Sequence, residues 1–491
     1  MEFSLQAKTI KQLTSILLVL SAVISTNSAV AKQKTISNQA LINTTEQIIE
    51  QYTKPGWFAG SVVIYKQGEV IYDKSFGLAD IENNIKNTSK TKIRIGSINK
   101  HFTAVLIMQQ VQAGKLSLDD TLSKFDLGFK ADIANKITVR QLLKHTSGFA
   151  DIFNQEYFET YQSLKDINAK LPLLMNKPLV SKPGEKHNYS NYGYIVLGAI
   201  LEKIEGKTFG QILQQHILNP INAHNTEYAL TDLVKGKAKS YHLDPLGNKI
   251  DRTPMLENVT PDGGMYSTPH DLALFFSKLF YSEKLLNDEA KAILTNRYKP
   301  TEKPWQHFLQ NPKTRWRSYG GGPGVSAAAE ILVADNLMVF VLANTDKLVA
   351  EYISQRIVDV YKGKQYQKVQ LPLTLFAKQL IDSKGNDFFL TDGANELTKA
   401  GYQNFHHREL NRVGMALYRL EKTDKLHQAI SVLTVNTKLF PQEPNTWDSL
   451  ALVYEKLGEK TKAIKYYKKS LTLDENFKSA KEGLERLEKL K

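Results

Sequence analysis

Ser97 and Lys100 are the first pair of residues in the sequence whose types and spacing could perform chemistry. The apolar residues Ala104, Ile107 and Met108 follow them at helical spacing. We therefore expect Ser97 to begin a buried helix, with Lys100 one turn further on the same face. In that arrangement a desolvated amine can accept the proton of the hydroxyl. Backbone N–H groups at a helix N-terminus would also favour a developing oxyanion.

This spacing is weak evidence by itself, because a capping serine followed by a solvated lysine gives the same pattern. The interpretation depends on two further segments. Tyr189-x-Asn191 precedes a strongly apolar run, residues 195–201, that predicts a helix. A glycine-rich segment, residues 320–324, predicts a turn that leads into a strand. Taken alone, Tyr189 and Asn191 would be interpreted as turn residues before a helix.

Together, in this order, the three segments resemble the serine β-lactamase and penicillin-binding-protein family. The similarity is strongest to the branch of class C β-lactamases and D-alanyl-D-alanine carboxypeptidases, which also includes esterases. Weaker similarities lie in residues 114–120, 143–149 and 263–268, so the resemblance covers most of residues 40–362. The implied fold is an α/β (α+β) β-lactamase/transpeptidase-like domain with an antiparallel sheet flanked by helices.

The resemblance implies a role for each residue of these segments. Ser97 would attack a carbonyl carbon and form an acyl-enzyme. Tyr189, as a phenolate or as a proton shuttle with Lys100, would take the serine proton and later deliver it to the leaving group. Asn191 would donate a hydrogen bond to the substrate or hold Lys100. The backbone N–H groups of Ser97 and Gly321 would form the oxyanion hole.

The third segment departs from the family pattern. Where the family has a lysine or histidine two positions before a glycine, this chain has Ser318 before Gly320. The resemblance implies that the missing cation binds a substrate carboxylate, so turnover of β-lactams or D-alanyl peptides is in doubt. Either Arg315 or Arg317 supplies the charge from nearby, or the substrate lacks a carboxylate, as an ester would.

Composition excludes several other classes of function. The chain has 491 residues, 42% of them hydrophobic, with a net charge of +14, but it has no nucleic-acid-binding motif. It contains no cysteine, and its 11 histidines show no zinc-ligand spacing, so we expect no metal and no cofactor. Residues 206–208 lack the earlier glycine of a phosphate-binding loop, because Leu201 stands there.

The pattern of apolar residues indicates how the site is positioned. Residues 60–65 and 70–72 predict a β-hairpin near the start, and residues 330–333 and 337–342 predict another near residue 340. Helices are predicted between them, and residues 150–185 are expected to be a long, mostly helical excursion. We therefore expect a single domain, residues 32–365, whose sheet is closed by its first and last segments.

The two ends of the chain predict further parts. Residues 1–31 combine two lysines, a short apolar core and an Ala-x-Ala site, which is typical of a cleaved signal peptide. This predicts a periplasmic or secreted protein with no stable membrane span. Residues 366–409 predict a linker with some helix. Ala429 and Ala463 lie 34 residues apart, and residues 410–491 resemble two tetratricopeptide repeats with a capping helix, an all-α domain.

Two functions remain open at this stage. The first is an exported serine hydrolase acting on an amide, β-lactam or ester, with a small molecule or peptide as substrate. The second is a hydrolase-like binding protein whose repeats recruit a protein or peptide partner, because such repeats stack helices into a concave groove. The presence of Ser97, Lys100 and Tyr189 favours the enzyme.

Overall fold

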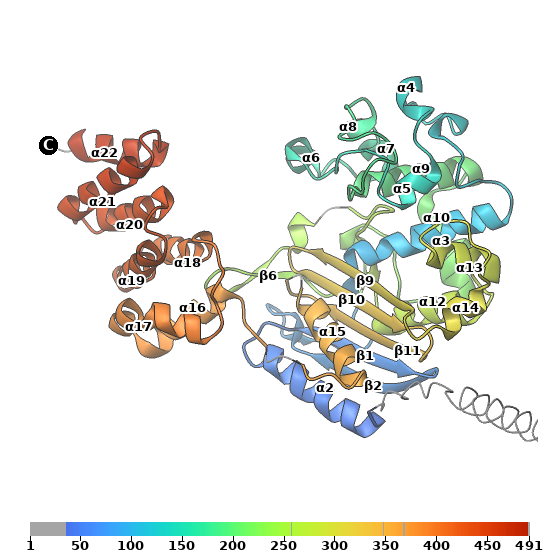
Figure 1. Ribbon diagram of the computed structural model, residues 1–491, viewed down its shortest axis with the longest axis horizontal. Coiled ribbons are helices and arrows are strands. Elements are labelled where there is room, and N and C mark those ends of the chain that lie inside the picture. Colours follow the sequence, from blue (N-terminus) through green and yellow to red (C-terminus); the bar gives the residue numbers. More distant parts are fainter. Residues whose placement is uncertain (1–35, 257, 347, 367–368, 490–491) are drawn as a thin grey trace, which may run out of the picture.

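The structure, a computed structural model, describes residues 36–256, 258–346, 348–366 and 369–489. It contains a sheet covered by helices and, beside it, a group of C-terminal helices (Figure 1). The predicted signal peptide, residues 1–31, lies outside the described residues. No helix in the described part of the chain is long and apolar enough to cross a membrane.

The central sheet has five antiparallel strands. They are β1 (Gly60–Lys66), β2 (Glu69–Phe76), β9 (Arg315–Gly322), β10 (Val325–Leu332) and β11 (Leu337–Ala343). Their order is β2-β1-β11-β10-β9, so β1 is paired along its length with β11. This confirms the predicted antiparallel sheet that the first and last segments close.

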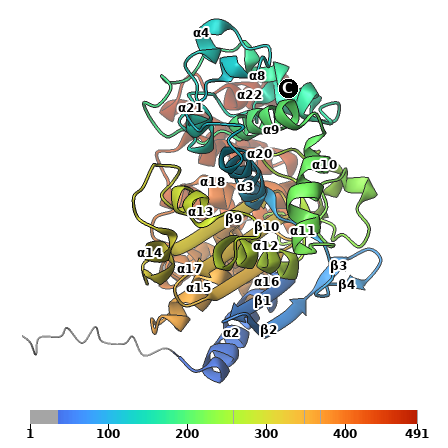
Figure 2. The ribbon, with the colours of Figure 1, turned by 90° about the vertical axis from the view of Figure 1, so that its right-hand side faces the viewer.

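Helices cover both faces of this sheet, and every residue of β10 and β11 is therefore buried. On one face lie α2 (Asn38–Thr53) and α15 (Val349–Tyr361), which share an apolar cluster with alternate residues of β1 and β11. On the other face lie α3 (Asn99–Gln112), α9 (Asn191–Glu205) and α12 (Pro269–Tyr281). Helices α3 and α9 lie side by side, which brings their N-terminal segments together (Figures 1 and 2).

The smaller elements surround this frame. Three two-stranded ribbons are formed by β3 (Leu78–Asp80) with β4 (Ile85–Lys86), β5 (Ile93–Arg94) with β8 (Tyr266–Ser267), and β6 (Tyr241–Leu243) with β7 (Lys249–Asp251). The remaining helices of this part are α4 (Ala131–Ala134), α5 (Val139–Leu143), α6 (Gln155–Thr160), α7 (Ile167–Lys170), α8 (Pro172–Met175), α10 (Phe209–Leu213), α11 (Asn219–Ile221), α13 (Asp288–Thr295) and α14 (Trp305–Gln310).

Two sequence predictions about local structure are wrong. Residues 150–185 were expected to be mostly helical, but only the short helices α6, α7 and α8 form there. Pro172, Pro178 and Pro183 interrupt the segment, because proline cannot supply the N–H that a continuing helix needs. The glycines 320–322 were expected in a turn, yet they belong to strand β9, and the turn is at Pro323 and Gly324.

The C-terminal helices form a second apolar core. They are α16 (Leu373–Lys384), α17 (Asn386–Lys399), α18 (Arg408–Tyr418), α19 (Thr423–Leu439), α20 (Pro444–Lys456), α21 (Lys460–Leu473) and α22 (Lys478–Lys489). Residues of α16 to α20 share one buried cluster. The predicted linker, residues 366–409, therefore contains two helices, α16 and α17, that pack against α18 and α19. The first helix of this part begins at Leu373, and the predicted domain boundaries stay a prediction.

Candidate active site

Ser97 and Lys100 are in contact at the beginning of α3. Ser97 is not the first residue of α3, contrary to the sequence prediction. It lies in a single 3₁₀ turn, Gly96–Ile98, which leads directly into the helix. Lys100 Nζ lies 3.2 Å from Ser97 Oγ, and the lysine side chain is buried. The spacing of three residues therefore places the amine beside the hydroxyl, as the helical register requires.

Tyr189 reaches the same hydroxyl from the segment before α9. Its phenol oxygen lies 2.9 Å from Ser97 Oγ. Lys100 Nζ lies 5.1 Å from the centre of the Tyr189 ring, a distance typical of a cation–π contact. The tyrosine is 42% exposed, so this side of the hydroxyl is open to solvent. The structure thus brings together the three side chains that the sequence predicted as the catalytic group.

Lys100 is held by three oxygen atoms. Its Nζ donates to Asn191 Oδ1 at 2.7 Å, to the carbonyl oxygen of Asp262 at 2.6 Å, and to Ser97 Oγ. An ammonium group has three N–H donors and no acceptor, so this set of oxygens fits the charged lysine. Of the two roles left open for Asn191, the contact supports holding Lys100.

Asp151 fixes the position of Asn191, a function that the sequence did not reveal. The Asn191 amide nitrogen Nδ2 donates to both oxygens of Asp151, at 3.1 and 3.0 Å, and the Asn191 backbone N–H donates to the same carboxylate. Because Nδ2 donates to Asp151, the amide must turn its oxygen toward Lys100. The only signal in the sequence was an aspartate in a loop, which is common at surfaces and specifies no partner.

The glycines of β9 allow its backbone to lie against the turn that carries Ser97. A Cβ atom at Gly320 would lie 2.0 Å from the carbonyl oxygen of Ile95 and 2.9 Å from the backbone nitrogen of Ser97. A Cβ atom at Gly96 would lie 2.8 Å from the backbone nitrogen of Gly321. The two N–H groups expected to form the oxyanion hole therefore belong to two backbones that only glycine allows to approach so closely.

Ser318 is buried and paired with a histidine. Its Oγ lies 2.6 Å from His101 Nε2, and the His101 ring packs against Trp316 and Phe276. Burial and the nearby charge of Lys100 lower the pKa of His101 to about 4, so the imidazole is neutral near pH 7. The position where the family pattern has a cation is thus occupied by an uncharged hydroxyl–imidazole pair.

The arginines proposed as substitutes point elsewhere. Arg315 Nε donates to Glu330 Oε2 at 2.7 Å, and Tyr319 contacts the same carboxylate, on the face of the sheet that α15 covers. Arg317 belongs to the same alternate set of strand residues, whereas Trp316 and Ser318 face His101. The expectation that Arg315 or Arg317 brings a positive charge to Ser318 is therefore wrong, because side chains alternate along a strand.

His145 stacks on Tyr189, with 4.3 Å between the ring centres. Its Nδ1 accepts a hydrogen bond of 3.3 Å from the Ser190 backbone N–H. Burial, with smaller contributions from the charges of Lys100 and His187, lowers the pKa of His145 to about 4. A neutral ring in this place supports the tyrosine and does not touch Ser97, which agrees with the structural role expected for it.

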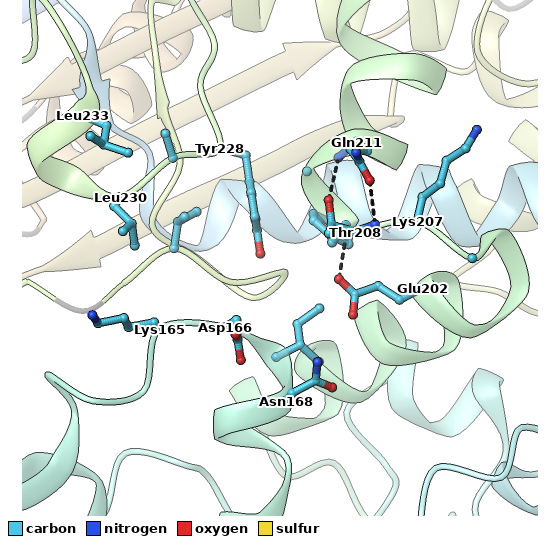
Figure 3. Close-up of a pocket in the computed structure, with 16 residues that line it drawn as sticks. Lys165, Asp166, Asn168, Glu202, Lys207, Thr208, Gln211, Tyr228, Leu230 and Leu233 are labelled. Atoms are coloured by element: carbon cyan, nitrogen blue, oxygen red, sulfur yellow. Dashed lines mark hydrogen bonds between the residues drawn. The ribbon is translucent and has the colours of Figure 1, made fainter.

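A hollow of about 700 Å³ lies between α7, α9 and α10, and Ser97 is not among the residues that line it (Figure 3). It is lined by residues 206–208, the segment that lacks the glycine of a phosphate-binding loop. The polar side chains here form hydrogen bonds at the ends of helices. Thr208 and Gln211 form a capping box, and Glu202 accepts a hydrogen bond from the Phe209 N–H at 2.7 Å. Asp166 lies across from Glu202, and two carboxylates disfavour a phosphate. Among the described residues, no cluster of side chains is placed to hold a metal ion.

Comparison with known proteins gives two family matches. The beta-lactamase family matches residues 45–362, and the tetratricopeptide repeat matches residues 444–477. The teichoic acid D-alanine hydrolase of Staphylococcus aureus is 27% identical over 255 residues, which are 51% of this chain and 62% of that protein. The chain therefore spans less than two thirds of the length of the curated relatives it matches.

Solved structures show the same fold. FmtA from S. aureus has 24% identity and a TM-score of 0.56, over 72% of this chain and 98% of that one. The octameric penicillin-binding protein homologue from Pyrococcus abyssi has 25% identity and a TM-score of 0.55, over 70% of this chain and 82% of that one. These findings confirm the predicted fold class and the expected family resemblance, including a tetratricopeptide repeat near the C-terminus.

Proposed function

Because the chain belongs to the beta-lactamase family, whose homologues of this fold are serine hydrolases, we propose that it hydrolyses its substrate through an acyl-enzyme on Ser97. The observation that carries the proposal is that Lys100 Nζ and the Tyr189 phenol both lie within 3.2 Å of Ser97 Oγ. An amine and a phenol from two distant segments thus meet at one hydroxyl, the arrangement expected of a nucleophile with its base.

The contacts assign a role to each group. Tyr189 acts as a phenolate that the neighbouring Lys100 ammonium stabilises. Ser97 Oγ attacks the carbonyl carbon while its proton passes to the phenolate oxygen, and the negative charge moves to the carbonyl oxygen. The N–H groups of Ser97 and Gly321 bind the oxyanion. When the tetrahedral intermediate collapses, Tyr189 returns the proton to the leaving group. A water molecule then attacks the acyl-enzyme by the same steps and frees Ser97.

An ester is the substrate class that fits the site best. The neutral pair of Ser318 and His101 offers no positive charge to a carboxylate next to the scissile bond. This disfavours β-lactams and D-alanyl peptides, which carry such a carboxylate. A D-alanyl ester has none, and the S. aureus relatives are named teichoic acid D-alanine hydrolases. We therefore propose esters, with D-alanyl esters as the first candidates.

We also propose that the protein is exported and that the repeats bind a protein or peptide. The predicted signal peptide supports export, because residues 1–31 have the required charge and apolar core. A fusion of residues 1–31 to a reporter enzyme, assayed for export and cleavage, tests this.

The alternative of a binding protein without turnover is less favoured, because the contacts of Ser97, Lys100 and Tyr189 are intact.

The hydrolase proposal is tested with a fluorophosphonate probe on purified residues 32–491. Wild-type protein is expected to be labelled, and Ser97→Ala is not. Ser123→Ala, which removes an exposed serine that is not part of the candidate site, serves as the matched control and should be labelled like the wild type. Equal labelling of Ser97→Ala would disprove the nucleophile. The absence of labelling and of ester hydrolysis in folded wild type would favour the binding protein.

A further inference from the structure

A hollow of about 720 Å³ lies at the end of β9, next to the candidate active site. We call it the aromatic pocket, and it is lined by Tyr157, Phe158, Tyr161, His242, Arg252, Met255, Gly322, Pro323, Asp346 and Leu348. Gly322 directly follows Gly321, whose N–H is assigned to the oxyanion hole. The pocket therefore begins one residue beyond the glycine whose N–H is assigned to the oxyanion hole.

The pocket exposes large apolar side chains to water. Phe158 is 63% exposed, Met255 58% and Leu348 41%. These three come from separate parts of the chain, namely α6, the loop after β7 and the residue before α15. Isolated apolar residues at a surface need no explanation, but a group of them that lines one hollow beside a reactive centre indicates a binding site.

Leu348 is held in an unfavourable backbone conformation. Its φ angle is +78°, in the left-handed region that a residue with a Cβ atom and a branched side chain rarely adopts. Such strain persists where the surrounding structure enforces it, often at a ligand site. Here the strain accompanies a leucine that lines the pocket instead of joining the core beneath α15.

The pocket also contains a positive charge without a carboxylate partner. Asp346 is occupied, because its oxygens accept from the Leu243 N–H at 2.6 Å and lie 2.7 Å from His242 Nδ1. Arg252 contacts the sulfur of Met255 at 3.1 Å, and within the described residues it forms no ion pair. A guanidinium group beside apolar walls suits a ligand that is apolar and negatively charged at one end.

We propose that the aromatic pocket binds the non-reacting part of the substrate, an apolar or aromatic body that carries a negatively charged group, and that Arg252 contacts that group. This inference rests on the proposed hydrolase function. It places the anion beyond Gly322 and away from Ser318, so it is compatible with an ester that lacks a carboxylate next to the scissile bond.

The test compares ester substrates that differ in length, aromatic content and charge. The probes are 4-nitrophenyl acetate, 4-nitrophenyl 4-phenylbutyrate and the 4-nitrophenyl monoester of suberic acid, together with acetate esters extended on the alcohol side by phenylpropyl and carboxyphenylpropyl groups. One of the two series, extended on the acyl side or on the alcohol side, should reach the pocket. For the long esters of that series, Phe158→Ala and Met255→Ala should lower kcat/KM about tenfold or more. Hydrolysis of 4-nitrophenyl acetate should stay within about twofold of wild type.

Arg252→Met tests the charge. In the series that reaches the pocket, it should lower kcat/KM about tenfold for the ester that carries a carboxylate. The kcat/KM of the neutral ester of the same series should stay within about twofold of wild type. Val70→Ala is the matched control, because Val70 is also exposed but lies on β2, at the opposite edge of the sheet. It should leave all ratios unchanged.

The outcomes separate this inference from the proposed function. If 4-nitrophenyl acetate is hydrolysed in a Ser97-dependent way but no pocket variant changes the ratio of long to short esters in either series, the pocket inference alone is wrong. If wild type hydrolyses no ester, binding of 4-phenylbutyrate and suberate is measured by calorimetry. Binding that Phe158→Ala and Arg252→Met weaken would still support the pocket, and equal binding would overturn it.

Discussion

His101 Nε2 lies 2.6 Å from Ser318 Oγ. This contact joins α3, where His101 follows Lys100, to strand β9. Burial and Lys100 keep this imidazole neutral, since its pKa is lowered to about 4. The site therefore contains one cation, Lys100, where the family pattern has two. This difference is the physical basis for expecting an ester and for the first prediction.

Replacing His101 with alanine should affect stability more than chemistry. It leaves the buried hydroxyl of Ser318 without its partner, which costs about 1–3 kcal/mol of the free energy of unfolding. At pH 7 we expect kcat/KM for a small neutral ester to fall by less than about tenfold, because a neutral histidine supplies no charge there. Urea unfolding and ester kinetics measure both effects. A loss beyond about 1,000-fold in folded protein would mean that His101 takes part in the chemistry.

Removing the hydroxyl of Tyr189 should abolish most of the activity. Tyr189→Phe eliminates the proton acceptor that lies 2.9 Å from Ser97 Oγ, and general-base catalysis contributes about 100- to 10,000-fold. Tyr192→Phe is the matched control, since its hydroxyl donates to the carbonyl of Leu171 and does not reach Ser97. It should lower the melting temperature but keep kcat. Equal kcat values for the two variants would argue against Tyr189 as the base.

Adding one methyl group at Gly320 should disrupt the site. The Cβ atom of Gly320→Ala would lie 2.0 Å from the Ile95 carbonyl oxygen, so β9 would have to move away from Ser97. We expect kcat/KM to fall by about 100-fold or more, because displaced oxyanion donors lose that much. Gly322→Ala, whose Cβ atom would have no neighbour closer than 3.8 Å, should hydrolyse 4-nitrophenyl acetate normally. Similar activity of both variants would contradict the close approach of the two backbones.

The C-terminal helices should lose stability as the pH rises. Burial raises the pKa of Asp448, on α20, to about 6, above its ordinary 3.8. The folded state therefore keeps a proton that the unfolded state releases between about pH 4 and pH 6, so stability falls through this window and stays lower above it. Asp448→Asn should slow hydrogen exchange of α20 at pH 7.5 more than at pH 4.5, after correction for intrinsic rates. Asp392→Asn, an exposed control, should show no such difference. Equal gains at both pH values would contradict the raised pKa.

How much of the site the sequence could predict depends on the range of each interaction. Ser97 and Lys100 are three residues apart, so helical geometry alone places them in contact. Tyr189 and Asn191 could be paired with them only through the family resemblance, because no local rule joins segments about 90 residues apart. Asp151 was missed for the same reason, since its partner is distant in the chain and an aspartate in a loop has many uses.

The sequence by itself determined most of the local elements, the family and the three catalytic candidates, because periodicity and motif order are properties of the chain. Only the tertiary structure decided what surrounds Ser318. Side chains alternate along β9, so Arg315 points to the opposite face of the sheet, while Ser318 faces His101 on α3. It also decided that residues of α6, β9 and the loop after β7 line one pocket. Charge and burial at a site are sums over segments that meet only in the folded chain, and no linear pattern records them.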